Sequence, residues 1–214
     1  MLPYYARLTL FIILSVLCGI FLLGLFFYQP LKGLLIRHNV MRFYYHRVMR
    51  EARFHDYYLV NDISYRLGGS DYVHIDHVLG GDKYIYVITD VYYDGAVSAK
   101  SDDVHWVNYP KKGKKVKIPN PLMTSKNAVD RFSKASGINT SFLVGIVLVN
   151  DDCFVTPIEN RRGEPVFTPL SRLGKVVAAY EKDNIDPFVG TELRNAMIAL
   201  HNEKENERAR NESK

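Results

Sequence analysis

The sequence has few residues that could cross-link or ligate a fold. Only two of its 214 residues are cysteines. Cys18 lies in an uncharged segment and Cys153 is alone in the rest of the chain, so no disulfide can form within the globular part. There is also no Gly-x-Ser-x-Gly elbow, no Walker loop and no dinucleotide-binding glycine motif. The sequence therefore gives no sign of a disulfide scaffold, a serine hydrolase or a nucleotide-binding enzyme.

Acidic residues are missing from the first 50 positions. Within them, the 21 residues from Leu8 to Tyr28 carry no charge at all. At about 1.5 Å per helical residue this length spans a hydrocarbon core of roughly 30 Å. A cleaved signal peptide is the alternative, but its apolar region would be shorter and followed by small residues, whereas this one ends in Phe26, Phe27 and Tyr28. We expect a transmembrane helix at about residues 8–28, within an N-terminal segment of residues 1–30.

Positive charge follows this segment. Residues 30–50 hold five cations and no acid, whereas all 23 acidic residues lie from Glu51 onward. The five cations are Lys32, Arg37, Arg42, Arg47 and Arg50. Positive flanks stay in the cytoplasm, so we expect a single-pass protein of the cell membrane with its N-terminus outside and its C-terminal domain cytoplasmic. A basic juxtamembrane helix over residues 31–56 could then dock on anionic lipid, where each cation contributes about 1 kcal/mol.

Strand-like segments rich in Val, Ile and Tyr come next. They are YYLVNDISYRL, YVHIDHVL and KYIYVITDVYY, and the turns GGSD and GGD separate them. These runs predict three antiparallel strands joined by hairpins. The segment AVSAKSDDVHWVNY followed by KKGKKVKI predicts one more hairpin with its tip at Gly113.

The second half of the chain shows helix signals. Asn120 suits a helix cap, Pro121 the first helical position and Gly137 the stop. The run SFLVGIVLVN that follows is typical of a strand covered on both faces. PLSRLGKVVAAYEK predicts a second helix, and a third should start near Asp186 and fray into the charged tail. We expect one α/β domain over residues 57–185, then a C-terminal helix and tail over residues 186–214.

Several short motifs occur in a characteristic order between residues 40 and 155. They are HIDHVLGG, IYVIT, YYDGAV, a tryptophan at 106 and NPL at the start of the next helix. In this order they resemble the nuclease-related domain (NERD), a branch of the PD-(D/E)xK nuclease superfamily. The resemblance implies a restriction-endonuclease-like αβββαβ domain with a mixed central sheet, following the transmembrane helix.

The resemblance also implies where a metal-dependent nuclease site would lie, and there the sequence departs from the pattern. Asp76 takes the position of the first acid, but Thr89 and Val91 take those of the family's glutamate and lysine. Asp90 is one residue off, so in a regular strand it points to the opposite face. Because one carboxylate is a poor Mg²⁺ site, we expect a catalytically inactive domain and no cofactor.

Two alternatives to an empty site remain. Asp76 could combine with Glu51 from the first helix and Lys126 from a later one, which would give an active membrane-tethered nuclease holding Mg²⁺ or Mn²⁺. His74 and His77 suggest zinc, but three apart on a strand they should face opposite sides and could not share an ion.

Binding is the function class that remains. Five lysines around Gly113 form the densest cationic cluster of the globular part: Lys111, Lys112, Lys114, Lys115 and Lys117. They could contact phosphate groups of nucleic acid or lipid, or form only a solvated hairpin tip. We expect a nucleic-acid- or protein-binding scaffolding module, with an anionic-lipid adaptor as the further alternative, and the sequence leaves the oligomeric state open.

Overall fold

The computed structural model describes residues 4–38, 40–68, 71–159 and 161–212. The chain divides into two compact units, residues 1–43 and residues 44–214. The first unit consists mainly of α1 (Tyr4–His38), and its segment Phe11–Tyr28 is long and apolar enough to cross a membrane, with none of it buried. Residues 31–38 continue α1, so the basic helix α2 (Val40–His55) is shorter than expected.

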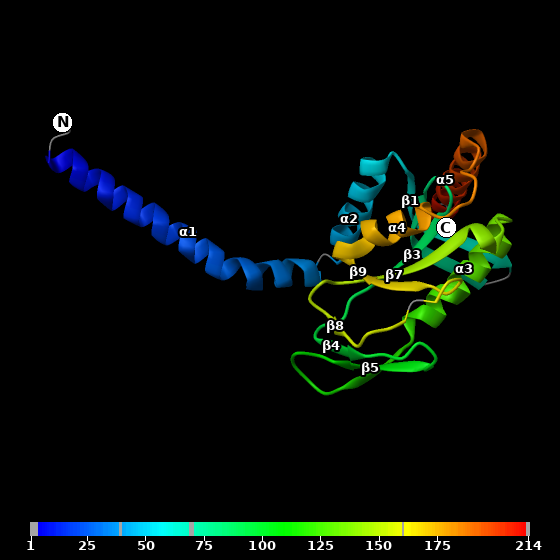
Figure 1. Cartoon of the computed structure of the whole chain (residues 1–214), viewed down its shortest axis with the longest axis horizontal. Helices are drawn as coiled ribbons and strands as arrows, with labels where there is room; N and C mark the ends of the chain where they lie inside the picture. Colours follow the sequence, from blue (N-terminus) through cyan, green and yellow to red (C-terminus); the bar gives the residue numbers. More distant parts are fainter. Residues whose placement is uncertain (1–3, 39, 69–70, 160, 213–214) are drawn as a thin grey trace. The chain divides into compact units, whose positions relative to one another are not determined.

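A mixed five-stranded sheet organises the second unit (Figure 1). Its strands lie in the order β1-β2-β3-β7-β9, with the bounds Tyr58–Gly68, Asp71–Gly80, Ile85–Val91, Leu143–Val149 and Val166–Pro169. The first three strands are antiparallel, and β7 and β9 continue the sheet in parallel with β3. The expected mixed α/β architecture is confirmed. Gly69 and Ser70, in the first predicted turn, lie outside the described residues.

The helix α3 (Pro121–Ser136) forms as its end signals predict. The Asn120 side chain accepts a hydrogen bond from the Leu122 N–H, and Pro121 opens the first turn. Gly137 ends the helix in a left-handed conformation, with φ of 74°. The chain then enters β7, every residue of which is buried. A continuous apolar run therefore does form the strand covered on both faces.

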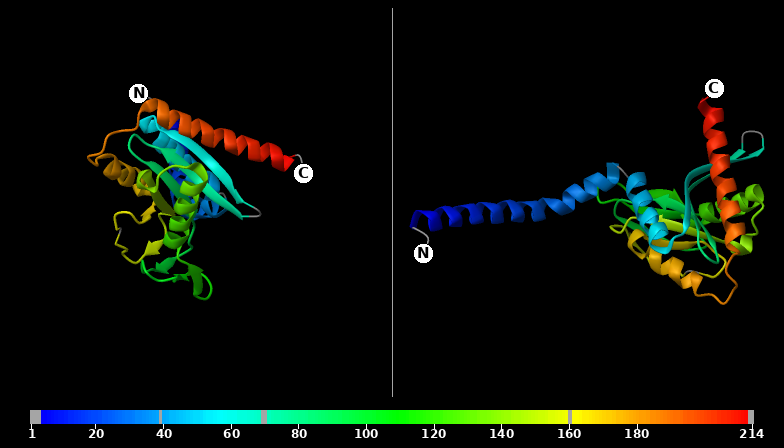
Figure 2. Two further views of the ribbon diagram at one scale, coloured as in Figure 1. Left: turned by 90° about the vertical axis from the view of Figure 1, so that its right-hand side faces the viewer. Right: turned by 90° about the horizontal axis from the view of Figure 1, so that it is seen from above.

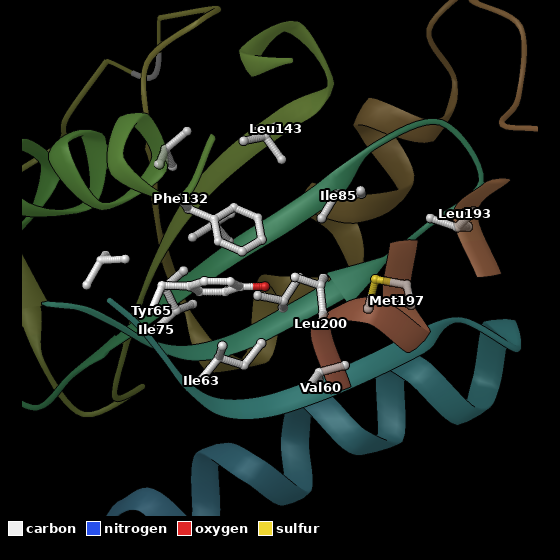
Figure 3. Close-up of a cluster of buried hydrophobic side chains, with 14 residues drawn as sticks. Val60, Ile63, Tyr65, Ile75, Ile85, Phe132, Leu143, Leu193, Met197 and Leu200 are labelled. Atoms are coloured by element: carbon white, nitrogen blue, oxygen red, sulfur yellow. The ribbon is translucent and has the colours of Figure 1, made fainter. Parts of the chain in front are cut away.

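One face of the sheet is covered by α3 and by α5 (Gly190–Glu212). Side chains from both helices join the main hydrophobic core, in which the rings of Tyr65 and Phe132 meet edge to face (Figure 3). From α5, Leu193, Met197 and Leu200 enter this core. Figure 2 shows α5 lying along the β1–β2 hairpin. The C-terminal segment thus differs from the expected fraying helix, because it starts at Gly190, continues to Glu212 and is partly core.

The opposite face carries α2 and α4 (Leu173–Glu181), with the short helix η2 (Leu170–Arg172) leading into α4. Tyr86 of β3 donates a 2.6 Å hydrogen bond to Glu181 at the end of α4. Arg47 of α2 donates to the carbonyl oxygens of Leu170 and Ser171, at 3.0 and 3.1 Å. One of the cations expected to meet lipid is thus engaged in holding α2 to η2. The side chains of Lys32 and Arg37 lie outside the described part.

A second sheet of four strands lies below the first in Figure 1, in the order β6-β5-β4-β8. Their bounds are Val116–Pro119, His105–Tyr109, Ala96–Ser98 and Phe154–Val155. The inner face of this sheet buries Trp106, whose ring lies 5.4 Å from that of Phe167. The predicted hairpin is β5–β6, and Gly113 lies between its strands with φ of 114°. The short helix η1 (Thr140–Phe142) precedes β7.

Candidate functional site

Asp76 lies on β2 and is bound by the neighbouring strand. Its Oδ2 accepts a 2.8 Å hydrogen bond from the backbone N–H of Asp90 on β3, and its Oδ1 lies 3.4 Å from His74 Nε2. The Asp76 side chain is 19% exposed. Asp76 is therefore accessible to solvent on one side and fixed to β3 on the other.

The position of Asp76 follows from an irregularity in β2. The β1–β2 pairing includes Asn61 with His77 and Ile63 with Ile75, but not the intervening Asp62 and Asp76. Asp62 has a φ of 55°, in the left-handed region that Asp tolerates better than most residues.

The burial pattern of β2 shifts by one residue at the same point. Ile75 belongs to the main core, and regular alternation would place His77 there too, but the next core residue is Val78. His77 instead contacts Asp90 and Asn61. Asp76 thus contacts the backbone N–H of Asp90, a contact that a regular β2 did not lead us to expect.

A buried hydrogen-bonded chain extends from Asp90. His77 Nε2 lies 2.9 Å from Asp90 Oδ2, and His77 Nδ1 lies 2.6 Å from Asn61 Oδ1. Each ring nitrogen of His77 thus has one hydrogen-bond partner, Asp90 on β3 and Asn61 on β1, so the imidazole links the three strands.

Asp90 is the unusual member of this cluster. Its side chain is only 10% exposed, and its Oδ1 is buried without a hydrogen-bond partner. Burial raises the pKa of the Asp90 carboxyl and outweighs the opposing hydrogen bond with His77, while the charge of Asp76 adds to the rise. A buried carboxylate oxygen without a donor favours the protonated acid.

Tyr44 of α2 closes the site from the helix side. Its hydroxyl donates a 2.7 Å hydrogen bond to the carbonyl of Val91, and the residue is fully buried. Burial, and next the charge of Asp90, raise the pKa of the Tyr44 hydroxyl. Beyond Val91, Asn150 at the end of β7 accepts from the Tyr93 N–H at 2.9 Å and donates to its carbonyl at 3.1 Å. The ends of β3 and β7 are thus held by side-chain hydrogen bonds.

The other predicted site residues lie apart from this cluster. Glu51 is buried with its carboxylate 3.3 Å from His55 Nε2 and against Gly174 at the start of α4. Lys126 is exposed on α3 and lines a cavity of about 420 Å³. The structure does not bring Glu51 or Lys126 into contact with Asp76, so that proposed site is not assembled. Thr89 is half-buried, and Val91 packs at the edge of the core under the second sheet.

The residues present do not fit a resident Mg²⁺. In the described part of the chain, no three His, Cys, Asp or Glu side chains are grouped so that they could hold a metal ion. Of the two adjacent acids, Asp90 is buried and paired with His77, while one oxygen of Asp76 accepts the Asp90 N–H. Mg²⁺ keeps several waters and dehydrates reluctantly, so a buried, paired carboxylate suits it poorly. His74 and His77 each contact a different acid, at 3.4 Å from Asp76 Oδ1 and 2.9 Å from Asp90 Oδ2.

The predicted lysine cluster is exposed. Lys111, Lys112, Lys114, Lys115 and Lys117 all face solvent at and near the tip of the β5–β6 hairpin. Their binding of phosphate groups stays a prediction, because exposure permits it without requiring it.

Sequence reasoning missed Asn61 and rejected Asp90. The pair Asn61–Asp62 in the middle of an apolar strand segment was the available signal, since both residue types tolerate positive φ and disturb strand alternation. Tyr44 was not singled out from the sequence either, because its bond to the Val91 carbonyl joins residues that are far apart in the chain.

No protein-family model matches this chain, and no curated protein sequence matches it either. A weak structural match is the crystal structure of AF1548, a protein of unknown function. It is 16% identical, its alignment covers 67% of this chain and 72% of that chain, and the TM-score is 0.32. This likeness is too distant to assign a fold or a function.

Proposed function

We propose that this chain is a membrane-anchored, catalytically inactive member of the nuclease-related domain group that serves as a nucleic-acid- or protein-binding scaffold. The order α2, β1, β2, β3, α3, β7 supports a restriction-endonuclease-like core, since it repeats the helix, three antiparallel strands, helix and strand that the resemblance implies. Function on such a scaffold depends on the residues of the site and not on the fold.

The hydrogen bonding of the two acids carries this proposal. Asp76 accepts the Asp90 N–H, Asp90 pairs with His77, and Val91 replaces the lysine that would act on water. Acids used in this way stabilise the junction of β2 and β3. They leave too little free negative charge for metal-assisted hydrolysis.

The membrane anchor in this proposal is the segment Phe11–Tyr28. The cations that follow it support an orientation with the globular unit in the cytoplasm and the N-terminus outside. In intact cells, a C-terminal epitope tag should be protected from added protease and become sensitive after the membrane is permeabilised. Cleavage of the tag in intact cells would contradict this orientation.

A nuclease assay tests the inactive site. The full chain in detergent micelles is incubated with single- and double-stranded DNA and RNA, with Mg²⁺ or Mn²⁺. We expect no cleavage above that of the Asp76→Ala variant. Asp102→Ala is the matched control, because Asp102 is an 80% exposed acid outside the site. Cleavage that is present in wild type and Asp102→Ala but lost in Asp76→Ala would overturn the proposal.

One observation favours the alternative of an active, rearranged nuclease: Asp90 Oδ1 is buried beside Asp76 without a partner. If Asp90 left His77, two carboxylates would become available together. This alternative predicts heat of Mn²⁺ binding in titration calorimetry that disappears in both Asp76→Asn and Asp90→Asn but persists in Asp102→Asn, whose side chain is 80% exposed. Absence of such heat, or heat that the site variants leave unchanged, would remove it.

A further inference from the structure

The outer face of the second sheet carries a row of three paired residues across three strands, and the two outer members are exposed aromatic side chains. Ala96 of β4 is paired with Tyr109 of β5 on one side and with Phe154 of β8 on the other. Side chains of paired residues stand on the same face of a sheet. Phe154 is 71% exposed and Tyr109 is 48% exposed, while the inner face buries Val97 and Trp106.

Lysines border the same face. Lys117 of β6 is paired with Val107 of β5, two residues from Tyr109, and it points to the outer side because Trp106 and its partner Ile118 belong to the inner core. Lys111 and Lys115 are exposed in the loop that joins β5 to β6, close to Tyr109 at the end of β5. Asp151, shortly before Phe154, accepts a hydrogen bond from the Ser171 N–H instead of facing the row.

We infer that this face, Tyr109–Ala96–Phe154 with Lys111, Lys115 and Lys117, binds single-stranded nucleic acid. Exposed aromatic rings stack on bases without regard to sequence, and lysines beside them hold the phosphates. Four-stranded sheets that present aromatic side chains bind RNA in this manner in other proteins. The inference rests on the proposed function only in treating the domain as a binding module.

The spacing of the two rings selects single strands. Neighbouring strands lie about 4.8 Å apart, so the backbone positions that carry Tyr109 and Phe154, two strands apart, are separated by about 10 Å. This is about three times the 3.4 Å rise between stacked bases of one strand in a duplex. Bases that stack on both rings must therefore be separated from one another, which an unpaired strand allows and a duplex does not.

An anionic membrane surface fits this face less well. The part of the hairpin that projects furthest, Lys111 to Lys115, contains lysines and Gly113 but no aromatic residue to enter a bilayer. Tyr109 and Phe154 lie on the sheet itself, where a flat strand of bases reaches them. The aromatic side chains and the lysine tip are thus arranged for a strand that passes over the sheet.

Fluorescence anisotropy of labelled oligonucleotides tests the inference on the full chain in nanodiscs of neutral lipid. We expect Phe154→Ala and Tyr109→Ala each to weaken binding of a mixed-sequence single strand about fivefold or more, because one base no longer has a ring to stack on. Phe54→Ala is the matched control, since Phe54 is 82% exposed on α2, away from this sheet. Binding of a duplex should be unchanged by Phe154→Ala.

Salt dependence tests the lysines separately. Removal of one lysine–phosphate interaction should reduce the slope of log affinity against log salt by about 0.7 for a single strand. We expect this change for Lys115→Gln and Lys117→Gln but not for Lys134→Gln, an exposed lysine of α3. Fluorescence of Trp106, the single tryptophan, checks that each variant is folded.

Three results would overturn the inference. The first is no measurable binding of single strands at low salt. The second is binding that depends on the lysines but not on Tyr109 or Phe154, which would show electrostatic attraction without stacking. The third is unchanged oligonucleotide binding in variants that lose association with anionic vesicles, which would assign the face to membrane. Failure here leaves the Asp76-dependent cleavage assay unaffected, so the two proposals can fail separately.

Discussion

The backbone N–H of Asp90 donates a 2.8 Å hydrogen bond to the carboxylate of Asp76, so that two neighbouring strands are joined by a side chain at the point where their pairing ends. The β2–β3 pairing runs from Gly80 with Ile85 to His77 with Ile88. Beyond it, Asp76 supplies the acceptor that the next backbone group of β3 needs. Asp76, which the resemblance places where the family has its first acid, thus takes the place of a backbone acceptor in the ladder between the two strands.

Replacing Asp76 by alanine should destabilise the globular unit by about 1–3 kcal/mol, because the Asp90 N–H loses its partner in a half-buried place. Asp76→Asn keeps an acceptor oxygen and should cost less. Urea unfolding of the full chain in detergent, followed by the fluorescence of buried Trp106, measures both. Asp102→Ala should lie within about 0.5 kcal/mol of wild type; an equal loss there would show that the measurement does not report on the site.

The Asp90 carboxyl should make stability depend on pH. Its pKa is raised in the folded state, chiefly by burial, so the folded state binds this proton more tightly than the unfolded chain does. The corresponding stability is fully present below the ordinary Asp pKa of about 3.9 and is lost as pH rises through the raised value.

Asp90→Asn removes this titration, so the variant should gain stability relative to wild type as pH rises from about 4 to 7. Unfolding free energies at several pH values in this range measure the difference. His77 contacts Asp90, so the same pH series in His77→Gln shows whether the pH dependence requires this contact. A difference between wild type and Asp90→Asn that is constant with pH would contradict the assignment.

Local signals predicted the elements of the fold well. The Asn120 cap, Pro121 and Gly137 bound α3 as expected, and the apolar run before Asn150 forms a fully buried strand. Such signals depend on residues within a few positions of one another, so they can be read without knowing the tertiary structure. The existence of a hairpin around Gly113 was predicted on the same grounds.

The site was predicted less well because it depends on an irregularity shared by two strands. The alternation of side chains between the two faces holds along β3, since Val87 enters the main core while Asp90 lies on the other face with His77. Along β2 this alternation is interrupted, because Ile75 and Val78, three residues apart, both enter the main core. A strand pattern assumes regular pleating, and no rule applied to β2 alone locates the positive φ of Asp62 on its neighbour.

Substitutions at three glycines distinguish two sources of strain, an unfavourable φ and a close contact with the backbone. Gly95 has a φ of 110°, and a Cβ there would lie 2.3 Å from the carbonyl oxygen of Tyr109. Gly113 has a φ of 114° but space around it, and Gly190 has neither constraint. Alanine at Gly113 should cost about 1–2 kcal/mol for the conformation alone. Alanine at Gly95 should cost more, because the backbone must also move.

The stability of the alanine variants, measured by thermal or urea unfolding, should therefore increase in the order Gly95→Ala, Gly113→Ala, Gly190→Ala. The last should be close to wild type. Gly95 accepts through its carbonyl a hydrogen bond from the Phe154 N–H, so displacement there should also disturb the face that carries Phe154. Equal stabilities of the Gly95 and Gly113 variants would show that the close approach to Tyr109 is not maintained.

The C-terminal helix provides the last test, because sequence reasoning placed it outside the domain and the structure packs it into the core. Met197 is 2% exposed among core side chains, whereas its neighbour Ile198 is 45% exposed. Met197→Ala should cost about 2–5 kcal/mol through reduced packing and the cavity left behind, and Ile198→Ala far less. The fluorescence of Trp106 reports on the unfolding of the second sheet. Destabilisation of that sheet by Met197→Ala would therefore also show that α5 and the second sheet unfold together. If Met197→Ala matched Ile198→Ala in stability, α5 would be an appendage to the sheet and not a part of its core.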